Sequence, residues 1–326
     1  MKIQGTVVDL MFSVIVVFTG LTIFVSASVS WNLVHGSSQE FVDLITQWDT
    51  AWYLGIVENG YHLKPKSSGP AAGRANWVFF PLYPGLVSIV RSMSGFNSQL
   101  AGIITSTLFA LIGCFFTVQY VSETRSKKPA LIAAILIFLG PLSFYSFTVH
   151  TESIFIALAV TGFWFLHHDR LFAAGLTGAF LSAARPTGVL FMIPMAVVII
   201  QQTGVVIDDQ YLVDEFGKGG PSVAEAFSDP RMFSIGLVPL GLFTYMTFLW
   251  LYVGDPLAFA HNQAAWGRSV GNPFLNIARW VTSGHPLPSL FAFTALFGLA
   301  AGGDLVRRGR YAEGLFAIML ILVPVS

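Results

Sequence analysis

The stretch QWDTAWYLGIVENGY, residues 47 to 61, places the carboxylates of Asp49 and Glu58 among aromatic side chains. A carboxylate in such surroundings can accept a proton from a hydroxyl group or stabilise positive charge that develops during a reaction. It can equally cap the helix predicted after it, because aspartate is a preferred N-cap residue. The residues alone leave both roles open for Asp49. Glu58 follows it by about two and a half helical turns and is expected to face the other way.

Several residues elsewhere carry the positive charge or the hydrogen-bond donors that bind a phosphate group. Arg185 is the most informative of them, because it ends an apolar run and precedes Pro186. The alternative is that its side chain extends to the membrane interface and keeps its charge in water. The full set consists of His150, Arg185 and Arg268, with Lys64, Lys66 and Arg74 as loop alternatives.

Two other acidic residues have a structural explanation beside a functional one. Glu152 follows Thr151 in the sequence HTES, where the pair can simply start the next helix as its cap and its first-turn acid. Asp255 precedes a proline in GDP, a signature of a helix N-terminus, and we interpret it mainly as a cap. On the helix predicted after it, a binding groove can be lined by Gln263, Trp266 and Arg268.

The composition indicates what kind of protein must position these residues. Of the 326 residues, 54% are hydrophobic and 10% are charged, and the mean hydropathy is +0.69, which is typical of a multi-spanning membrane protein. Basic and acidic residues number 17 each, so no net charge directs the chain toward nucleic acid. The single cysteine, Cys114, lies in an apolar run and is expected to be a packing residue.

Apolar runs predict an all-α, single-domain protein of about nine transmembrane helices. The N-terminal run of about 22 apolar residues favours a retained first span, although SASVS leaves signal-peptide cleavage open. Several later runs are shorter than the ~20 residues of a straight crossing. They cover about 99–121, 129–147, 152–166, 171–185, 187–201, 232–253, 287–306 and 311–326.

A large outer loop, about residues 32–98, follows the first span. Its run WVFFPLYPGLVSIV contains Pro81 and Pro84, which would break a spanning helix, so we predict an interfacial or re-entrant segment. The positive-inside rule then places the basic turns on the cytoplasmic side, together with the acidic connector at about 203–231. The non-cytoplasmic face collects the outer loop, HTES, ARPTG and GDPLAFAHNQAAWGR. Ionisable residues that converge there predict a shared cavity.

Four blocks of the sequence resemble one family, in the same order along the chain. QWDTAWYLGIVENGY with the following FFPLYPGLVSIVR is similar to the first luminal loop of the PIG-V family, the mannosyltransferases that add the second mannose to the GPI anchor, and of their prokaryotic relatives. HTESIFIALAVTGFWFL, LFAAGLTGAFLSAARPTGVL and GDPLAFAHNQAAWGR resemble the later blocks of the family. The resemblance covers most of residues 40–270, and the short loops favour a prokaryotic relative.

The resemblance implies a GT-C glycosyltransferase that takes a sugar, mannose in this family, from a polyprenyl-phosphate donor on the non-cytoplasmic face. It implies that Asp49 is the catalytic base and that the anomeric centre is inverted, which requires one base opposite the leaving group. The acceptor would be a lipid-linked or cell-surface glycan. Aromatic residues of the first loop can stack on sugar or form an interfacial belt, and they are Trp48, Trp52, Tyr53 and Tyr61.

No metal ion is expected as a cofactor. The outer loops contain no compact carboxylate motif, the chain contains no cysteine cluster, and protein cations can neutralise the single phosphate of the donor. The expected partners are the lipid-linked donor, the glycan or glycolipid acceptor, membrane lipids and an accessory membrane subunit, with no nucleic acid. The protein would work in a prokaryotic cell membrane, or in the endoplasmic reticulum membrane of a eukaryote.

Two other classes of protein stay open. A transporter or lipid flippase would also have many spans and intramembrane charges, although no internal repeat is visible. A non-catalytic relative that keeps the fold as a scaffold is the third interpretation. The chain stops at FAIMLILVPVS, where family members usually continue into a loop with an Arg-Tyr pair and a further span. We therefore expect its C-terminal end to be incomplete.

Overall fold

The computed structural model describes residues 2–35, 49–203, 229–268 and 271–325. In these ranges the regular elements are all helices and no strand occurs, which confirms the predicted all-α class. Trp48 and most of the predicted 203–231 connector lie outside the described residues.

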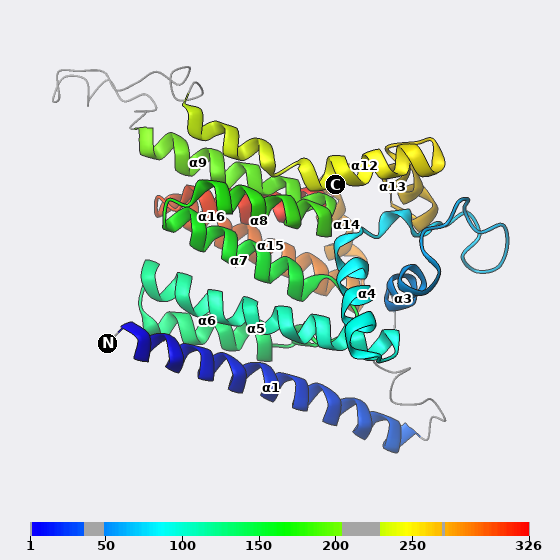
Figure 1. The fold of residues 1–326 in the computed structure, drawn as a ribbon, viewed down its shortest axis with the longest axis horizontal. Coiled ribbons are helices and arrows are strands. Elements are labelled where there is room, and N and C mark those ends of the chain that lie inside the picture. The colour runs from blue at the N-terminus through cyan, green and yellow to red at the C-terminus, as the bar shows by residue number, and fades with distance from the viewer. Residues whose placement is uncertain (1, 36–48, 204–228, 269–270, 326) are drawn as a thin grey trace.

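The longer helices lie side by side along the long axis of the molecule (Figure 1). Helix α5 packs against α1, α6 and α7, and α7 packs in turn against α8. Helix α12 covers α8, and α16 packs against both α9 and α15. Their bounds are α1 Lys2–His35, α5 Ser98–Thr124, α6 Lys127–Leu139, α7 Glu152–His167, α8 Leu171–Ala184, α9 Met192–Thr203, α12 Leu240–Val253, α15 Pro286–Arg307 and α16 Tyr311–Val325.

Three of the described helices are long and apolar enough to cross a membrane, namely Gly5–Ser30 within α1, Ser98–Thr124 and Pro288–Arg307. A fourth crossing would be formed by η4 (Pro230–Leu237) and α12 together, which meet at an angle of 44°. The shorter apolar helices have 10–17 residues. The total of about nine crossings therefore stays a prediction.

The outer surface of the bundle is rich in exposed apolar side chains. Leu136, Phe172, Leu251 and Phe297 lie on four different helices and are all exposed. Water would disfavour such a surface, whereas the hydrocarbon of a bilayer accepts it. Together with the long apolar helices, this surface is compatible with a membrane protein.

Helix α5 approaches its neighbours closely through small residues. A Cβ atom added to Gly113 would lie 3.3 Å from the backbone nitrogen of Ala157 in α7, and one added to Gly102 would lie 2.8 Å from a methyl group of Val149. Small residues at helix contacts let backbones come together, which stabilises helix pairs in a membrane. Cys114 is a buried free thiol beside Gly113, as expected for a packing residue.

A buried charge lies inside the first candidate span. Asp9 of α1 forms an ion pair with Lys127 at the start of α6, and it accepts a hydrogen bond of 2.8 Å from Gln119 of α5. A carboxylate at membrane depth is costly unless it has such partners. These contacts fix α1 against α5 and α6, and no motif in the sequence predicts them.

Prolines set the helix boundaries in two segments. The helix predicted at 129–147 is wrong as a continuous span, because α6 ends at Leu139 before Gly140 and Pro141, and the short η2 (Ser143–Ser146) follows. In the outer loop, α4 (Leu82–Ser94) begins directly after Pro81. With 13 residues α4 is about 20 Å long, too short for a crossing of ~30 Å.

The bundle has two different ends (Figure 1). One end, which we call the basic end, holds the N-terminus and the turns 125–128, 167–170 and 307–310. The other, the loop end, holds η1 (Asn76–Val78), α3 (Thr50–Asn59), α4, α13 (Ala258–His261) and α14 (Pro273–Thr282). Hydrogen bonds from α3 to Val149, from Arg185 to Thr151 and from Arg74 to Ala265 join the four segments that the sequence predicted on one face.

Candidate functional site

Asp49 lies directly before α3 and starts the site. Its backbone is helical, with φ −72° and ψ −14°, and its carbonyl oxygen accepts hydrogen bonds from the amides of Trp52 and Tyr53 at 3.0 and 3.2 Å. Its carboxylate makes no capping hydrogen bond and none to any other described residue. The helix-cap role considered for this side chain is therefore wrong. Gly60 ends α3 at φ +74°, as predicted.

Arg185 turns toward the start of α7. Its Nε donates to the hydroxyl of Thr151 at 2.5 Å, and its Nη2 donates to Oε1 of Glu152 at 2.5 Å. Thr151 and Glu152 do begin α7, as their structural explanation predicted, but both side chains hold the guanidinium group instead of capping the helix. The Arg185 side chain is thus held by these partners while 37% of it stays exposed, so the alternative in which it extends to the interface stays open. We use the name polar cluster for Asp49, Tyr53, His150, Thr151, Glu152 and Arg185.

The members of the polar cluster act on one another electrostatically. The carboxylate of Asp49 lies within range of Tyr53, His150 and Arg185. Burial raises the pKa of Tyr53 to about 12, although Arg185 opposes this effect. Tyr53 is therefore a neutral phenol at physiological pH.

His150 is the most deeply buried titratable group of the polar cluster. It is 5% exposed, and its Nδ1 lies 2.9 Å from the hydroxyl of Thr148. Burial lowers the pKa of His150, although the carboxylates of Glu152 and Asp49 act in the opposite direction. The His150 ring is therefore neutral near pH 7, so it can offer a hydrogen bond but no positive charge. The positive charge of the polar cluster must come from Arg185.

Buried hydroxyl groups hold the turn that carries His150. Ser106 of α5 donates to the carbonyl oxygen of Thr148 at 2.7 Å, and its Oγ lies 2.7 Å from the hydroxyl of Tyr83 in α4. Thr50 of α3 donates to the carbonyl of Val149 at 3.4 Å. These residues were not predicted, because single hydroxyl side chains scattered along helices have no distinctive spacing in the sequence.

An aromatic cluster, formed by Trp52, Phe79 and Trp266, lies beside the polar cluster. The ring centroid of Trp52 is 4.9 Å from that of Trp266 and 5.9 Å from that of Phe79. Two cations cover its rings, with Lys66 Nζ 4.6 Å from the centroid of Trp52 and the guanidinium of Arg74 5.0 Å from that of Trp266. Trp52 comes one helical turn after Asp49, so α3 presents both clusters from one face.

Asn262 joins the outer loop to the 254–268 segment. Its Oδ1 accepts hydrogen bonds from the amide of Ala75 at 2.9 Å and from the indole of Trp266 at 3.3 Å. Its Nδ2 donates to the carbonyl of Gly73 at 3.0 Å. Asn262 was not predicted as a functional residue, and its only signal in the sequence is a polar amide within the GDPLAFAHNQAAWGR block.

Asp255 closes a turn at the start of this segment. It accepts a hydrogen bond from the amide of Leu257 at 2.9 Å and pairs with His261 at 2.8 Å. The hydrogen bond from His261 lowers the pKa of Asp255. The prediction that Asp255 caps a helix is wrong: the N-cap of α13 (Ala258–His261) is Leu257, and Asp255 bonds within the turn before it.

The remaining predicted residues lie at the edge of the two clusters. Tyr61 donates to the carbonyl of Phe79 at 2.7 Å and packs in the core of the loop end. Arg268 follows η5 (Asn262–Trp266) and donates to Gln263 at 3.4 Å on the surface. Trp266 is the one residue of this predicted groove that the structure places in the aromatic cluster. Trp48 lies outside the described residues.

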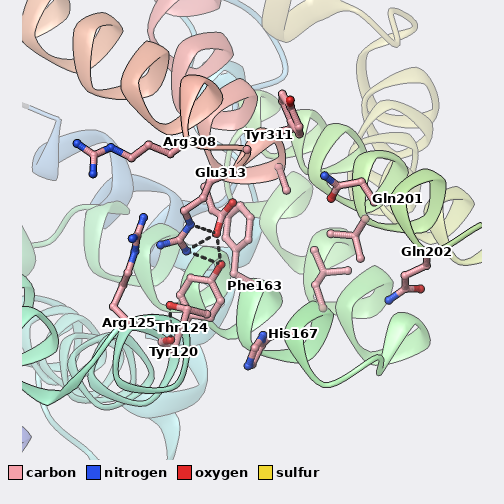
Figure 2. A pocket seen from close by; sticks show the side chains of 15 residues that line it. Tyr120, Thr124, Arg125, Phe163, His167, Gln201, Gln202, Arg308, Tyr311 and Glu313 are labelled. Carbon is pink, nitrogen blue, oxygen red and sulfur yellow. Dashed lines mark hydrogen bonds and ion pairs between the residues drawn. The ribbon is translucent and has the colours of Figure 1, made fainter. Parts of the chain in front are cut away.

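Two cavities in the described part of the chain lie away from these clusters. One of about 510 Å³ opens at the basic end (Figure 2). The other, of about 520 Å³, lies where α4 meets α5, beside Arg91 and Asn97. None of the predicted site residues lines either cavity. The shared cavity expected at the loop end stays a prediction. The evidence for a candidate site there is the polar cluster and the aromatic cluster.

Comparisons with protein-family models, with curated proteins and with solved structures give no match to this chain. The likeness to the PIG-V family thus rests on the four sequence blocks. Among the described residues, no group of three or more histidine, cysteine or carboxylate side chains could hold a metal ion. That no metal ion is required stays a prediction.

Proposed function

We propose that this protein is a membrane glycosyltransferase of the GT-C type. It moves a sugar, mannose by its resemblance to the PIG-V family, from a polyprenyl-phosphate donor to a lipid-linked or cell-surface glycan. The position of Asp49 carries the proposal. Its carboxylate precedes α3 without a hydrogen bond to any described residue, within electrostatic range of Arg185. A carboxylate that no described side chain engages can accept a proton from a hydroxyl group brought within hydrogen-bond reach.

In the proposed reaction, Asp49 accepts the proton of the acceptor hydroxyl while that oxygen bonds to the anomeric carbon of the donor. The bond from this carbon to the phosphate oxygen breaks, and the lipid phosphate leaves with the electron pair. The carboxylate also stabilises the positive charge that develops on the sugar. Glu152 is engaged with Arg185 and does not serve as a nucleophile. Displacement with one base and no covalent intermediate inverts the anomeric centre.

The leaving phosphate requires positive charge beyond that of Arg185. Within the polar cluster, Asp49 and Glu152 oppose the single guanidinium, and His150 is neutral. Lys66 supplies a further cation over the aromatic cluster, and Arg74 supplies another there. We therefore assign the donor phosphate to the side of the aromatic cluster, where these cations gather.

The aromatic cluster offers flat apolar faces on which a sugar ring can stack. Trp266 brings the 254–268 segment to this place, so the segment is suited to shape the acceptor groove. About nine crossings and a site on the non-cytoplasmic side belong to the same proposal. The basic turns at the opposite end of the bundle support this orientation, because basic turns prefer the cytoplasm.

Transfer of labelled sugar tests the proposal. The purified full chain is reconstituted into liposomes with radiolabelled polyprenyl-phosphate mannose and a membrane lipid extract, and product is measured for the wild type and for Asp49→Asn. Glu58→Gln is the matched control, because Glu58 is an exposed carboxylate on the same helix and outside both clusters. We expect transfer by the wild type and by Glu58→Gln, and none by a folded Asp49→Asn variant.

Each other outcome has a defined meaning. Equal transfer by Asp49→Asn and the wild type would exclude Asp49 as the base. Equal loss in Glu58→Gln would show that any carboxylate change on α3 disturbs the site. Transfer of lipid across the bilayer without any new glycosidic bond would replace the enzyme by a flippase.

A further inference from the structure

The cavity at the basic end is built from segments that are far apart in the sequence (Figure 2). The ends of α5, α7 and α9 and the turn between α15 and α16 contribute to it. Its volume of about 510 Å³ lies within the range of ~300–1,000 Å³ found for ligand pockets. It is separated from the polar cluster by the length of the bundle, so the proposed reaction makes no use of it.

A closed network of hydrogen bonds forms one wall of the cavity. Arg310 is ion-paired with Glu313, and the hydroxyl of Tyr120 donates to the same carboxylate oxygen at 2.5 Å. The Nη2 group of Arg310 also donates to Tyr120 at 3.3 Å. None of these contacts uses Nη1 of Arg310, so a fixed guanidinium keeps donors for a further acceptor.

Two more guanidinium groups lie on one side of this network, as Figure 2 shows for Arg125 and Arg308. Arg125 makes no hydrogen bond or ion pair through its side chain with any described residue. Arg308 pairs at 2.6 Å with the exposed Asp304, one turn earlier in α15. The lining residues thus include three arginines and the carboxylate of Glu313; with Asp304 counted against Arg308, one positive charge is left in excess. Gln201 and Tyr311 add neutral donors to the lining.

The two outer arginines lie at the level where apolar helices end. Arg125 directly follows the candidate span Ser98–Thr124, and Arg308 directly follows Pro288–Arg307. In a bilayer, residues at this level meet the lipid headgroups, and basic pockets between helices there bind anionic headgroups. Guanidinium groups can also bind two oxygens of a phosphate at once, in a bidentate geometry.

We infer that this cavity is a phosphate-binding site whose ligand is the phosphate of an anionic membrane lipid. A free phosphate ion carries the same chemistry, so the experiment separates the two sources. The site is independent of the proposed transfer reaction.

Lipid binding to the purified, delipidated full chain in detergent tests the inference. Retained phosphatidylglycerol is counted by native mass spectrometry, with phosphatidylcholine as the zwitterionic reference and inorganic phosphate as the soluble competitor. Arg125→Gln and Arg308→Gln are expected to weaken phosphatidylglycerol binding about fivefold each, and the double variant about 30-fold, from ~1 kcal/mol for each basic residue. Both side chains are exposed, so these changes should leave the melting curve unaltered.

Arg170→Gln is the matched control, because Arg170 is exposed at the same end of the bundle but does not line the cavity. It should bind phosphatidylglycerol as the wild type does. Equal binding by the wild type and the double variant would overturn the inference. So would equal weakening in Arg170→Gln, or binding of phosphatidylcholine as tight as that of phosphatidylglycerol. Displacement of the lipid by low concentrations of inorganic phosphate would keep the site and make free phosphate its ligand.

Discussion

Replacing Asn262 by alanine should release the outer loop from the 254–268 segment. The side chain is 9% exposed and makes three hydrogen bonds, with Ala75, Gly73 and Trp266. Each contributes about 0.5–1.5 kcal/mol net, so their loss lowers the free energy of local opening by about 1.5–4.5 kcal/mol. The opening equilibrium then shifts by about one to three orders of magnitude, since ~1.4 kcal/mol corresponds to a factor of ten.

Hydrogen exchange read by mass spectrometry measures this shift, because the amide of Ala75 loses its acceptor. Peptides from residues 73–79 should exchange faster by that factor, while peptides from α5 and α7 should be unchanged. Asn97→Ala is the matched control, because Asn97 accepts from the amide of Leu100 at 2.8 Å and caps α5. It should loosen the start of α5 only. Unchanged exchange at 73–79 in Asn262→Ala would refute the reasoning.

Three further predictions concern the site and the bundle. Arg185→Lys keeps the charge but loses the paired contacts to its neighbours, so the rate of sugar transfer should fall about 10²-fold with an unchanged melting temperature; equal rates would show that this geometry is not used. Gly241→Ala should destabilise the protein by about 1–3 kcal/mol in a thermal melt, because a Cβ atom there would lie 2.0 Å from the carbonyl oxygen of Ala179. Gly236→Ala is the control and should leave the stability unchanged, because no atom lies within 4 Å of a Cβ atom at that position. Burial holds the pKa of His150 below 6.5, so at acidic pH the unfolded chain binds more protons than the folded one, and the stability should fall as the pH drops below about 6.5. In thermal melts between pH 7.5 and 5, His150→Gln should reduce the dependence of the melting temperature on pH. An unaltered dependence would assign it to other groups.

Local signals in the sequence were sufficient for several parts of the fold. Gly60 ends α3 and Pro81 precedes α4, because each residue restricts the backbone wherever it stands. The prediction of a continuous helix at 129–147 was wrong. It followed the apolar character of the whole run and gave too little weight to Gly140 and Pro141, where α6 ends. The pair of Asp9 with Lys127 was not predictable from spacing, because it depends on which helices become neighbours.

In the candidate site, too, the general location could be predicted from the sequence, whereas the contacts of the side chains could not. Membrane topology alone placed Asp49, Glu152 and Arg185 at one end, and the structure brings them together. The direction of each side chain could not be predicted, because it depends on burial and on partners from other segments. This is why the neutral state of His150 and the bridging role of Asn262 became visible only in three dimensions.

The buried carboxylate of Asp9 has a consequence for how the chain is assembled. Its partner Gln119 stands 110 positions later in the sequence, and Lys127 follows still further on. During synthesis, α1 therefore emerges from the ribosome before the two described partners of Asp9 have been made. An unpaired carboxylate prefers the aqueous boundary, so α1 is expected to lie shallow or tilted until the α5–α6 hairpin arrives. The final packing of α1 is then expected to follow the synthesis of α5 and α6.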